Sequence, residues 1–310
     1  MTQLTTRSGA AVRPFSFGTM QFGGKADEAA AAAMFDLCCA AGITHFDTAY
    51  LYTDGRSEEI LAPLIKANRD DLYVATKVGY AGGAGRANMR KQFDVSRKRL
   101  QSDQIDLLYL HRFDPDTELR ETMDTFATLK SQGLIRHIGL SNFAAWQVMK
   151  AQRIAAEFGV RVNVLQPMYS LVKRQAEVEI LPMCADQGIA ACTYSPLGGG
   201  LLSGKYNAGD TGRLTEDDRY AARYAQAAMT TAANGLSELA QGLGAHPATL
   251  AIAWIAAQEH RPQPILSAKN TDQLTPSLKA LTFEMTSELY REISALMPAP
   301  PPATDRLEEA

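Results

Sequence analysis

Short apolar runs alternate along the chain with longer segments whose apolar residues recur at helical spacing. The runs that predict strands are 14–20, 43–46, 71–78, 104–111, 135–142, 163–169, 190–197 and 263–268. The segments that predict helices are 27–41, a segment from 57 onward, 88–100, 118–132, 144–158, 175–187, 230–243, 247–258, 271–281 and 287–296. Strand and helix thus alternate eight times, which predicts parallel strands joined by right-handed crossovers.

Eight such units over about 250 residues are typical of a (β/α)8 TIM barrel. A doubly wound open sheet is the competing fold, but GTMQFG at 18–23 does not match the dinucleotide fingerprint GxGxxG. We therefore expect residues 1–310 to form a single barrel domain with an additional C-terminal helix. Residues 297–310, which are rich in Pro and Ala, are expected to form a mobile tail.

The composition is that of a soluble globular protein, with 46% hydrophobic residues, 21% charged residues and a net charge of −3. This charge provides no basic field for nucleic acid, and a solvated helix face explains the charged run 86–99. The sequence shows neither a signal peptide nor an 18-residue apolar run, and its four scattered cysteines suit neither a disulfide framework nor a zinc site. We expect a cytoplasmic protein with a small-molecule partner, no nucleic acid and no membrane, and leave assembly into a homo-oligomer open.

Polar side chains stand at the carboxyl ends of six predicted strands, in steps of 25 to 34 residues. They are Asp47, Lys77, His111, Ser141 with Asn142, Gln166, and Tyr194 with Ser195. In a parallel barrel these ends meet on one face, where the catalytic groups of such enzymes collect. We therefore expect these residues to share one site.

The stretch FDTAYLY at 46–52 contributes a carboxylate and a phenol to this site. An ion pair of Asp47 with Lys77 would reduce the cost of burying each charge. Lys77 beside Tyr52 is expected to lower the pKa of the phenol from about 10, toward the range useful to a general acid. His111 can hydrogen-bond a substrate oxygen or relay a proton. When a Tyr protonates a carbonyl oxygen, another group must deliver a hydride to the carbonyl carbon. Because the sequence shows no cluster of metal ligands, we expect an organic hydride donor.

Seven motifs resemble those of the aldo-keto reductase family, in the same order along the chain. They are GTMQFGG at 18–24, FDTAYLYTDGRSEEIL at 46–61, ATKVG at 75–79, DLLYLHRFD at 106–114, IRHIGLSNF at 135–143, LQPMYS at 165–170 and YSPLGGGLLSGKY at 194–206. The resemblance implies a (β/α)8 barrel that binds NADPH or NADP+ without a Rossmann domain. It also implies reversible reduction of an aldehyde or ketone, the small-molecule carbonyl substrate, to an alcohol.

By the same resemblance the catalytic residues are Asp47, Tyr52, Lys77 and His111, with Tyr52 as the proton donor. The implied cofactor contacts come from four parts of the chain. They are Gly18, Thr19, Met20 and Asp47; Ser141, Asn142 and Gln166 at the nicotinamide carboxamide; Tyr194 on the nicotinamide ring, with Ser195, Pro196, Leu197, Gly199, Leu201 and Lys205 in a strap over the pyrophosphate; and Ser267, Lys269, Gln273 and Ser277 toward the adenosine 2′-phosphate and the adenine. Glycines let the strap backbone approach phosphate, and Lys205 adds positive charge.

The segment ILSAKNTDQL at 265–274 resembles the part of the family that opens the last barrel helix. A cation at Lys269, just before a helix N-terminus, forms an anion site and predicts that NADPH is preferred over NADH. The family often ends this segment with Glu-Asn, whereas this chain has Pro276-Ser277, so the adenine contact departs from the pattern.

A substrate pocket is expected to be largely apolar. The candidates for its lining are Met20, Tyr80, Phe113, Met168 and Tyr169, with packing inside the barrel as the alternative for Met20 and Met168. The histidines at 45, 137, 246 and 260 match no family site and are interpreted as structural or surface residues.

The pattern also resembles the branch of the family that includes potassium-channel β-subunits. An active carbonyl reductase is the leading hypothesis. A nucleotide-sensing, partner-binding protein with little turnover is the alternative, because that branch keeps the same four catalytic residues.

Overall fold

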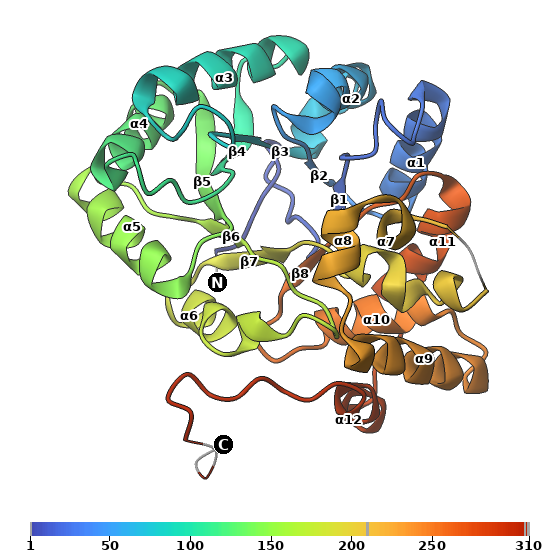
Figure 1. Cartoon of the computed structure of the whole chain (residues 1–310). Coiled ribbons are helices and arrows are strands. Elements are labelled where there is room, and N and C mark those ends of the chain that lie inside the picture. The colour runs from blue at the N-terminus through green and yellow to red at the C-terminus, as the bar shows by residue number, and fades with distance from the viewer. Residues whose placement is uncertain (1, 209–210, 307, 309–310) are drawn as a thin grey trace.

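The computed structural model describes residues 2–208, 211–306 and 308. Eight parallel strands close into a barrel in sequence order, and β8 pairs with β1 (Figure 1). They are β1 (Ser16–Gly18), β2 (His45–Asp47), β3 (Tyr73–Val78), β4 (Ile105–Leu110), β5 (Ile135–Ser141), β6 (Val164–Gln166), β7 (Ala190–Thr193) and β8 (Gln263–Leu266). The closed barrel confirms the predicted (β/α)8 fold.

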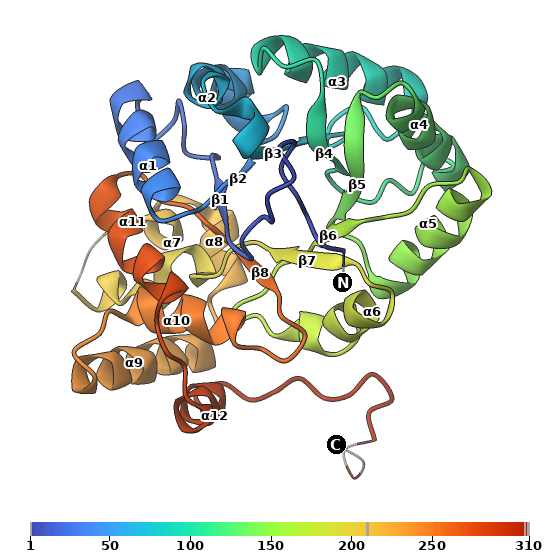
Figure 2. The same ribbon diagram turned by 180° about the vertical axis from the view of Figure 1, so that it is seen from behind.

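Helices cover the outside of the barrel (Figures 1 and 2). They are α1 (Glu28–Ala40), α2 (Arg56–Lys66), α3 (Arg86–Arg99), α4 (Leu119–Ser131), α5 (Ala145–Glu157) and α6 (Ile180–Asp186), then α7 (Arg213–Glu216), α8 (Asp218–Arg223), α9 (Ala227–Gly242) and α10 (Pro247–Ala256) after β7, and α11 (Thr271–Leu278) and α12 (Ser287–Ala295) after β8. The helix α12 confirms the additional C-terminal helix.

Helix α1 illustrates why the pattern folds in this way. Asp27 caps its N-terminus by accepting a hydrogen bond from the Ala30 amide at 2.8 Å. Its buried face carries Met34, Phe35 and Cys38 at helical spacing. The Phe35 ring stacks on Phe46 of β2 with 4.5 Å between centroids, so helix burial holds the strand that ends in Asp47.

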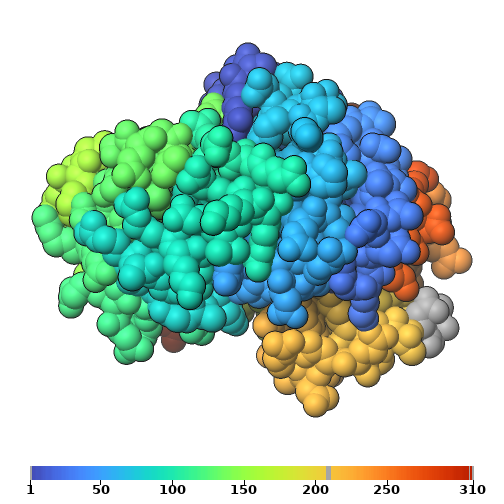
Figure 3. All heavy atoms as spheres, turned by 90° about the horizontal axis from the view of Figure 1, so that it is seen from above, coloured from blue at the N-terminus to red at the C-terminus, as the bar shows by residue number. Residues whose placement is uncertain are grey.

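The N-terminal segment closes one end of the barrel. Thr5 and Ala11 form an antiparallel bridge, and Leu4 packs into the apolar cluster inside the barrel. Figure 2 shows this segment crossing the barrel, while α7 and α8 lie toward the viewer in Figure 1. In the space-filling view the gold atoms of the segment after β7 project from one end and the dark-blue N-terminal atoms from the other (Figure 3). The N-terminal segment therefore does not block the carboxyl ends of the strands, which lie at the other end of the barrel, beside α7 and α8.

Several predicted elements are shorter than expected. Strand β6 ends at Gln166 because Pro167 lacks an amide hydrogen, and Met168 forms only an isolated bridge to Tyr194. Strand β7 ends at Thr193, just before Ser195 with its left-handed φ of +59°. The predicted helix at 175–187 divides into a 3-10 turn (Gln175–Glu177) and α6.

The predicted tail begins at a well-anchored point. The Arg174 guanidinium donates hydrogen bonds to the carbonyls of Ser294, at 3.1 Å, and Met297, at 2.7 Å. Beyond it the chain forms an extended trace with one turn, and residues 307, 309 and 310 of the predicted tail lie outside the described residues. The mobility of the tail and the single-domain organisation stay predictions.

Candidate active site

A cavity of about 940 Å³ lies at the carboxyl ends of the strands. Its wall combines residues from the strand ends with residues from α7, α8 and the start of α11 (Figure 1). The predicted site residues on this wall are Gly18, Met20, Asp47, Tyr52, Tyr80, His111, Ser141, Asn142, Gln166, Tyr194, Ser195, Pro196, Leu197, Gly199, Lys205, Ser267, Lys269, Gln273 and Ser277. The barrel thus gathers residues that are more than 200 positions apart in sequence.

Lys77 is the fully buried cation behind this wall. Its Nζ donates to the Asp47 carboxylate, to the Thr48 carbonyl at 2.8 Å and to the Tyr52 hydroxyl oxygen at 3.2 Å. All three ammonium hydrogens therefore have an acceptor. Burial alone lowers the pKa of Lys77, but Asp47 and Tyr52 outweigh burial and raise it, so the side chain stays charged.

Asp47 is held from two sides. One carboxylate oxygen pairs with Lys77, and the other accepts a hydrogen bond from Gln166 Nε2 at 2.9 Å. The register of β2 and β3 places Asp47 opposite Ala75, so Lys77 stands two residues further along the neighbouring strand and reaches back. The ion pair that the sequence predicted is present and buried.

The expected pKa shift of Tyr52 was wrong in direction. Burial raises the pKa of the phenol above its ordinary value of 10, and the Lys77 charge opposes that shift without overcoming it. Sequence reasoning weighed only the neighbouring cation. Tyr52 therefore keeps its proton at neutral pH. Because Lys77 donates to the phenol oxygen, the Tyr52 hydrogen is left to point elsewhere.

His111 is a neutral partner beside Tyr52. Burial, reinforced by the charges of Lys77 and Arg112, lowers the pKa of His111 to about 3. Its ring meets the Tyr52 ring edge-on at 5.9 Å between centroids. Its buried Nδ1 has no hydrogen-bond partner within the described part of the chain. A neutral imidazole at this point can donate or accept one hydrogen bond without carrying charge.

Polar side chains at the ends of β5, β6 and β7 lie next to Tyr52 and His111. The Asn142 amide donates to the His111 carbonyl at 2.9 Å and accepts from the Tyr194 hydroxyl at 2.7 Å. Asn142 has a φ of +58°, a left-handed conformation that costs energy for a non-glycine residue. Ser141 donates to the Gln166 carbonyl at 3.1 Å. These bonds fix amide and hydroxyl groups beside the catalytic candidates, with the Tyr194 ring next to them.

The backbone after β7 makes a tight cradle on the same wall. Gly199 and Gly200 adopt φ of +68° and +98°, and a Cβ at Gly200 would lie 2.9 Å from Lys205 Cε. The positive φ values favour glycine at both positions, since the end of the Lys205 side chain could move aside for a Cβ. An ion pair between Lys25 and Glu216 connects the loop after β1 with α7.

The start of α11 borders the far end of the cavity. Asn270 caps the helix by accepting from the Gln273 amide at 3.0 Å, and Gln273 Oε1 accepts from the Lys269 amide at 3.3 Å. Lys269 and Ser267 are exposed on the wall. A cation beside a helix N-terminus is thus available to an anion in the cavity.

Some predicted contacts lie behind the wall. Thr19 is fully buried and shares a hydrogen bond of 2.7 Å with Ser57, and Leu201 packs into the core. They support the loops without lining the cavity.

Three of the five substrate-pocket candidates, Phe113, Met168 and Tyr169, do not line this cavity. Tyr169 is fully buried, donates to Glu177 at 2.7 Å and stacks on Trp254. Phe113 packs edge-on against Phe143, and Met168 lies beyond the end of β6. Side-chain direction after a strand end depends on packing, so the sequence could not separate them from Met20 and Tyr80, which do line the cavity.

The histidines outside the predicted site have mainly structural contacts. Nδ1 of His246 caps α10 by accepting from the Ala248 amide at 3.0 Å, although His246 also borders the cavity. His137 Nδ1 shares a hydrogen bond of 3.0 Å with the Tyr73 hydroxyl.

Sequence reasoning missed several wall residues, among them three arginines and a tyrosine. Arg112 directly follows His111, a signal that went unused. Arg213, Tyr220 and Arg223 come from α7 and α8, whose irregular sequence gave no indication that they fold over the cavity.

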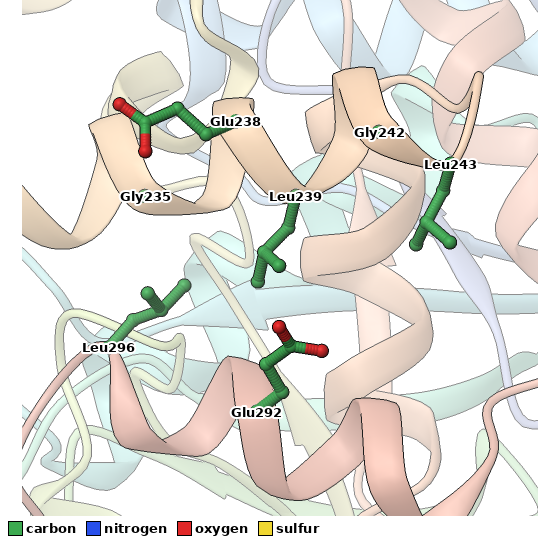
Figure 4. A pocket seen from close by; sticks show the side chains of 7 residues that line it. All are labelled: Gly235, Glu238, Leu239, Gly242, Leu243, Glu292 and Leu296. Atoms are coloured by element: carbon green, nitrogen blue, oxygen red, sulfur yellow. The ribbon is translucent and has the colours of Figure 1, made fainter.

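A second cavity of about 440 Å³ lies between α9 and α12 (Figure 4). Leu239, Leu243 and Leu296 line it together with Glu238 and Glu292. Within the described ranges, no group of three or more His, Cys, Asp or Glu side chains could hold a metal ion.

Comparison with known proteins agrees with this geometry. The model of the Aldo/keto reductase family matches residues 14–298. The chain belongs to the aldo/keto reductase family. Among its relatives, the "Uncharacterized oxidoreductase YrpG" of Bacillus subtilis is 31% identical, with 95% of each chain covered. Membership supports an oxidoreductase that acts on carbonyl groups.

Two further relatives of this reductase have more specific names. The "Probable voltage-gated potassium channel subunit beta" of Oryza sativa is 32% identical over 96% of this chain and 97% of its own. The "Aflatoxin B1 aldehyde reductase member 2" of Rattus norvegicus is 36% identical over 69% of this chain and 60% of its own. In the part of the chain that the structure describes, no helix is both long and apolar enough to span a membrane.

Proposed function

We propose that this aldo/keto reductase uses NADPH to reduce aldehydes and ketones reversibly to alcohols. The observation that carries the proposal is the buried Lys77 ammonium, which bridges Asp47 and Tyr52 beside the neutral His111 ring. A protonated phenol held at a cavity wall is suited to protonate a carbonyl oxygen. The name of the rat relative, an aldehyde reductase, points to the same reaction class.

Each residue has a distinct role in this proposal. Tyr52 gives its proton to the carbonyl oxygen as negative charge develops there. When bound, NADPH would be the source of the hydride for the carbonyl carbon. The phenolate that remains is stabilised by the ammonium of Lys77, which already donates to the same oxygen. Asp47 keeps that ammonium charged and in place. His111 orients the carbonyl oxygen through a hydrogen bond from a neutral ring.

The residues on the wall fit the expected cofactor. Ser141, Asn142 and Gln166 would hold the carboxamide, and the Tyr194 ring would lie against the nicotinamide. The cradle at Gly199 and Gly200, whose backbone lines the cavity, would hold the pyrophosphate with Lys205.

The same proposal assigns the 2′-phosphate to the start of α11. Lys269 supplies the charge there, with Ser267 and the free amides of the first turn as donors. Asn270 and Gln273 already bond the backbone of this turn, so Lys269 carries the largest share of NADPH selectivity.

The test follows the absorbance of NADPH with a panel of aldehydes and ketones. We expect oxidation that depends on the carbonyl compound, and we expect Tyr52→Phe to lose it while still binding NADPH. NADPH binding without turnover of any panel member would overturn the proposal. The cytoplasmic location and the lack of nucleic-acid and membrane partners stay predictions.

A second candidate function rests on the rice relative. Its name, that of a probable channel subunit, and its near full-length match favour a protein that docks onto a partner, and we infer that such a protein would bind NADPH as a sensor. The same panel separates the two, since this candidate requires tight NADPH binding with little turnover.

A further inference from the structure

The cavity wall has an excess of positive charge near the catalytic candidates. Among the described residues, six Lys or Arg side chains line it against three Asp or Glu. Two of the three carboxylates already have a partner. Glu216 pairs with Lys25 on the wall, and Asp47 pairs with Lys77, which lies behind the wall. Lys205 and Lys269 stand at the cradle and at the start of α11, where the proposed function uses them.

Three guanidiniums on the wall, those of Arg112, Arg213 and Arg223, have no such assignment. The Arg213 guanidinium donates to the Tyr220 hydroxyl at 3.4 Å, which leaves Arg112 and Arg223. Over residues 2–208, 211–306 and 308, the guanidinium groups of Arg112 and Arg223 form no ion pair and no hydrogen bond with the protein. Asp114 lies near enough for Arg112 to affect it, but its carboxylate already accepts from Thr117 Oγ1 at 2.6 Å and from the Ala84 amide at 2.7 Å. The donors of both guanidiniums are therefore available to a ligand.

Aromatic rings hold both guanidiniums in place. The Cζ of Arg112 lies 4.7 Å from the Tyr80 ring centroid, and the Cζ of Arg223 lies 5.1 Å from that of Tyr220. A guanidinium that lies over a ring leaves its N–H edge free. That planar edge matches a carboxylate or a phosphate with two parallel hydrogen bonds.

Both residues lie close to the reacting position. The centroids of the Tyr80 and His111 rings are 5.1 Å apart. The Arg112 guanidinium, which lies over the Tyr80 ring, is therefore separated from His111 by that ring alone. Tyr220, under Arg223, is close enough to Tyr52 to influence its pKa, which burial raises. The two arginines come from the loop after β4 and from the end of α8, and so approach the cavity from separate elements.

We propose that Arg112 and Arg223 select carbonyl substrates that carry an anionic group, a carboxylate or a phosphate, at the end away from the carbonyl. The inference rests on the proposed carbonyl reductase function and names its substrate class. A neutral substrate leaves both guanidiniums without a partner, whereas an anionic one gains charge-assisted hydrogen bonds. Arg112 and Arg223 are specificity-determining residues, because neither acts on the reacting atoms.

The test compares each of two anionic benzaldehydes with a neutral benzaldehyde substituted at the same ring position, at saturating NADPH. 4-Formylbenzoate is measured against its methyl ester, and 4-formylphenyl phosphate against 4-methoxybenzaldehyde. The variants are Arg112→Met and Arg223→Met. Arg219→Met is the matched control, since Arg219 shares α8 with Arg223, is exposed, pairs with Asp217 and does not line the cavity.

We expect wild-type kcat/KM to be at least about 10-fold higher for an anionic aldehyde than for its neutral analogue. Each Met variant should lower the anionic value about 10- to 100-fold, mainly through KM, as expected for loss of a charged hydrogen bond. The neutral analogue, the NADPH dissociation constant and the Arg219→Met control should each stay within about twofold. The larger of the two anionic preferences shows whether carboxylate or phosphate is the natural group.

Three results would overturn the inference. They are an equal wild-type kcat/KM for charged and neutral aldehydes, an equal loss for both in the variants, and weaker NADPH binding in the variants. The comparison of charged with neutral aldehydes needs only the wild-type protein, so this test remains valid even where a variant fails to fold. Reduction of the neutral ester without an anionic preference refutes only the substrate class. Failure to reduce any of the four aldehydes refutes the proposed function as well.

Discussion

Lys77→Met removes the cation at the centre of the site while keeping most of the side-chain volume. Lys77 is fully buried, and its ammonium makes three hydrogen bonds. After the substitution Asp47 keeps only Gln166 as a side-chain partner for a buried carboxylate. We therefore expect a large loss of stability in addition to the loss of activity.

The magnitude follows from the cost of a buried charge without its partner. Breaking a buried ion pair from one side costs about 3–5 kcal/mol of unfolding free energy. An unfolding entropy of about 2.1 cal/mol/K per residue gives roughly 0.65 kcal/mol/K for the 310 residues. The melting temperature should therefore fall by about 5–8 °C. The double variant Asp47→Asn with Lys77→Met should recover about 1–3 kcal/mol of this loss, because no unpaired charge remains.

Scanning calorimetry of the cofactor-free protein measures all three melting temperatures. Arg153→Met serves as the control: Arg153 pairs with Glu157 at an exposed position, so Tm should move by no more than about 1 °C. If Lys77→Met melts within about 2 °C of wild type, the buried pair does not stabilise the protein as argued. If the double variant melts below Lys77→Met, the unpaired carboxylate is not the cause of the loss.

Further predictions concern activity and the cofactor. Tyr52→Phe should reduce single-turnover rate by 100-fold or more, the scale of a lost general acid, with NADPH affinity unchanged; a rate near wild type would remove Tyr52 from that role. Because the Tyr52 pKa lies above 10, reduction should persist through neutral pH and decline only as the phenol ionises at alkaline pH. In Lys77→Met this alkaline limb of the pH–rate profile should move to higher pH, since the cation that opposes the raised pKa is gone, and an unmoved limb would contradict the coupling. Asp47→Asn should reduce activity less than Lys77→Met, because Asp47 acts on Tyr52 only through Lys77; the reverse order would contradict that role. Lys269→Ala should weaken NADPH binding about 10- to 100-fold and leave NADH nearly unchanged, and equal losses in fluorescence titrations would show that Lys269 does not bind the 2′-phosphate.

The sequence was sufficient for the fold and for bringing many of the candidate site residues to one cavity. The alternation of apolar runs with helical segments is local information, and eight repeats of it leave the parallel barrel as the compact solution. Asp47, His111 and Gln166 each stand at the end of a strand, so closure of the barrel brings them to one face without further assumptions.

Tertiary structure decided what depends on burial and on long-range packing. The direction of the Tyr52 pKa shift depends on how much of the whole chain surrounds the phenol, and this burial outweighs the single cation that the sequence revealed. Tyr169 and Tyr80 both follow strands, yet only packing sends one into the core and the other to the cavity. Arg223 reaches the site because α8 folds over the barrel, and no local pattern in that irregular segment encodes such a contact.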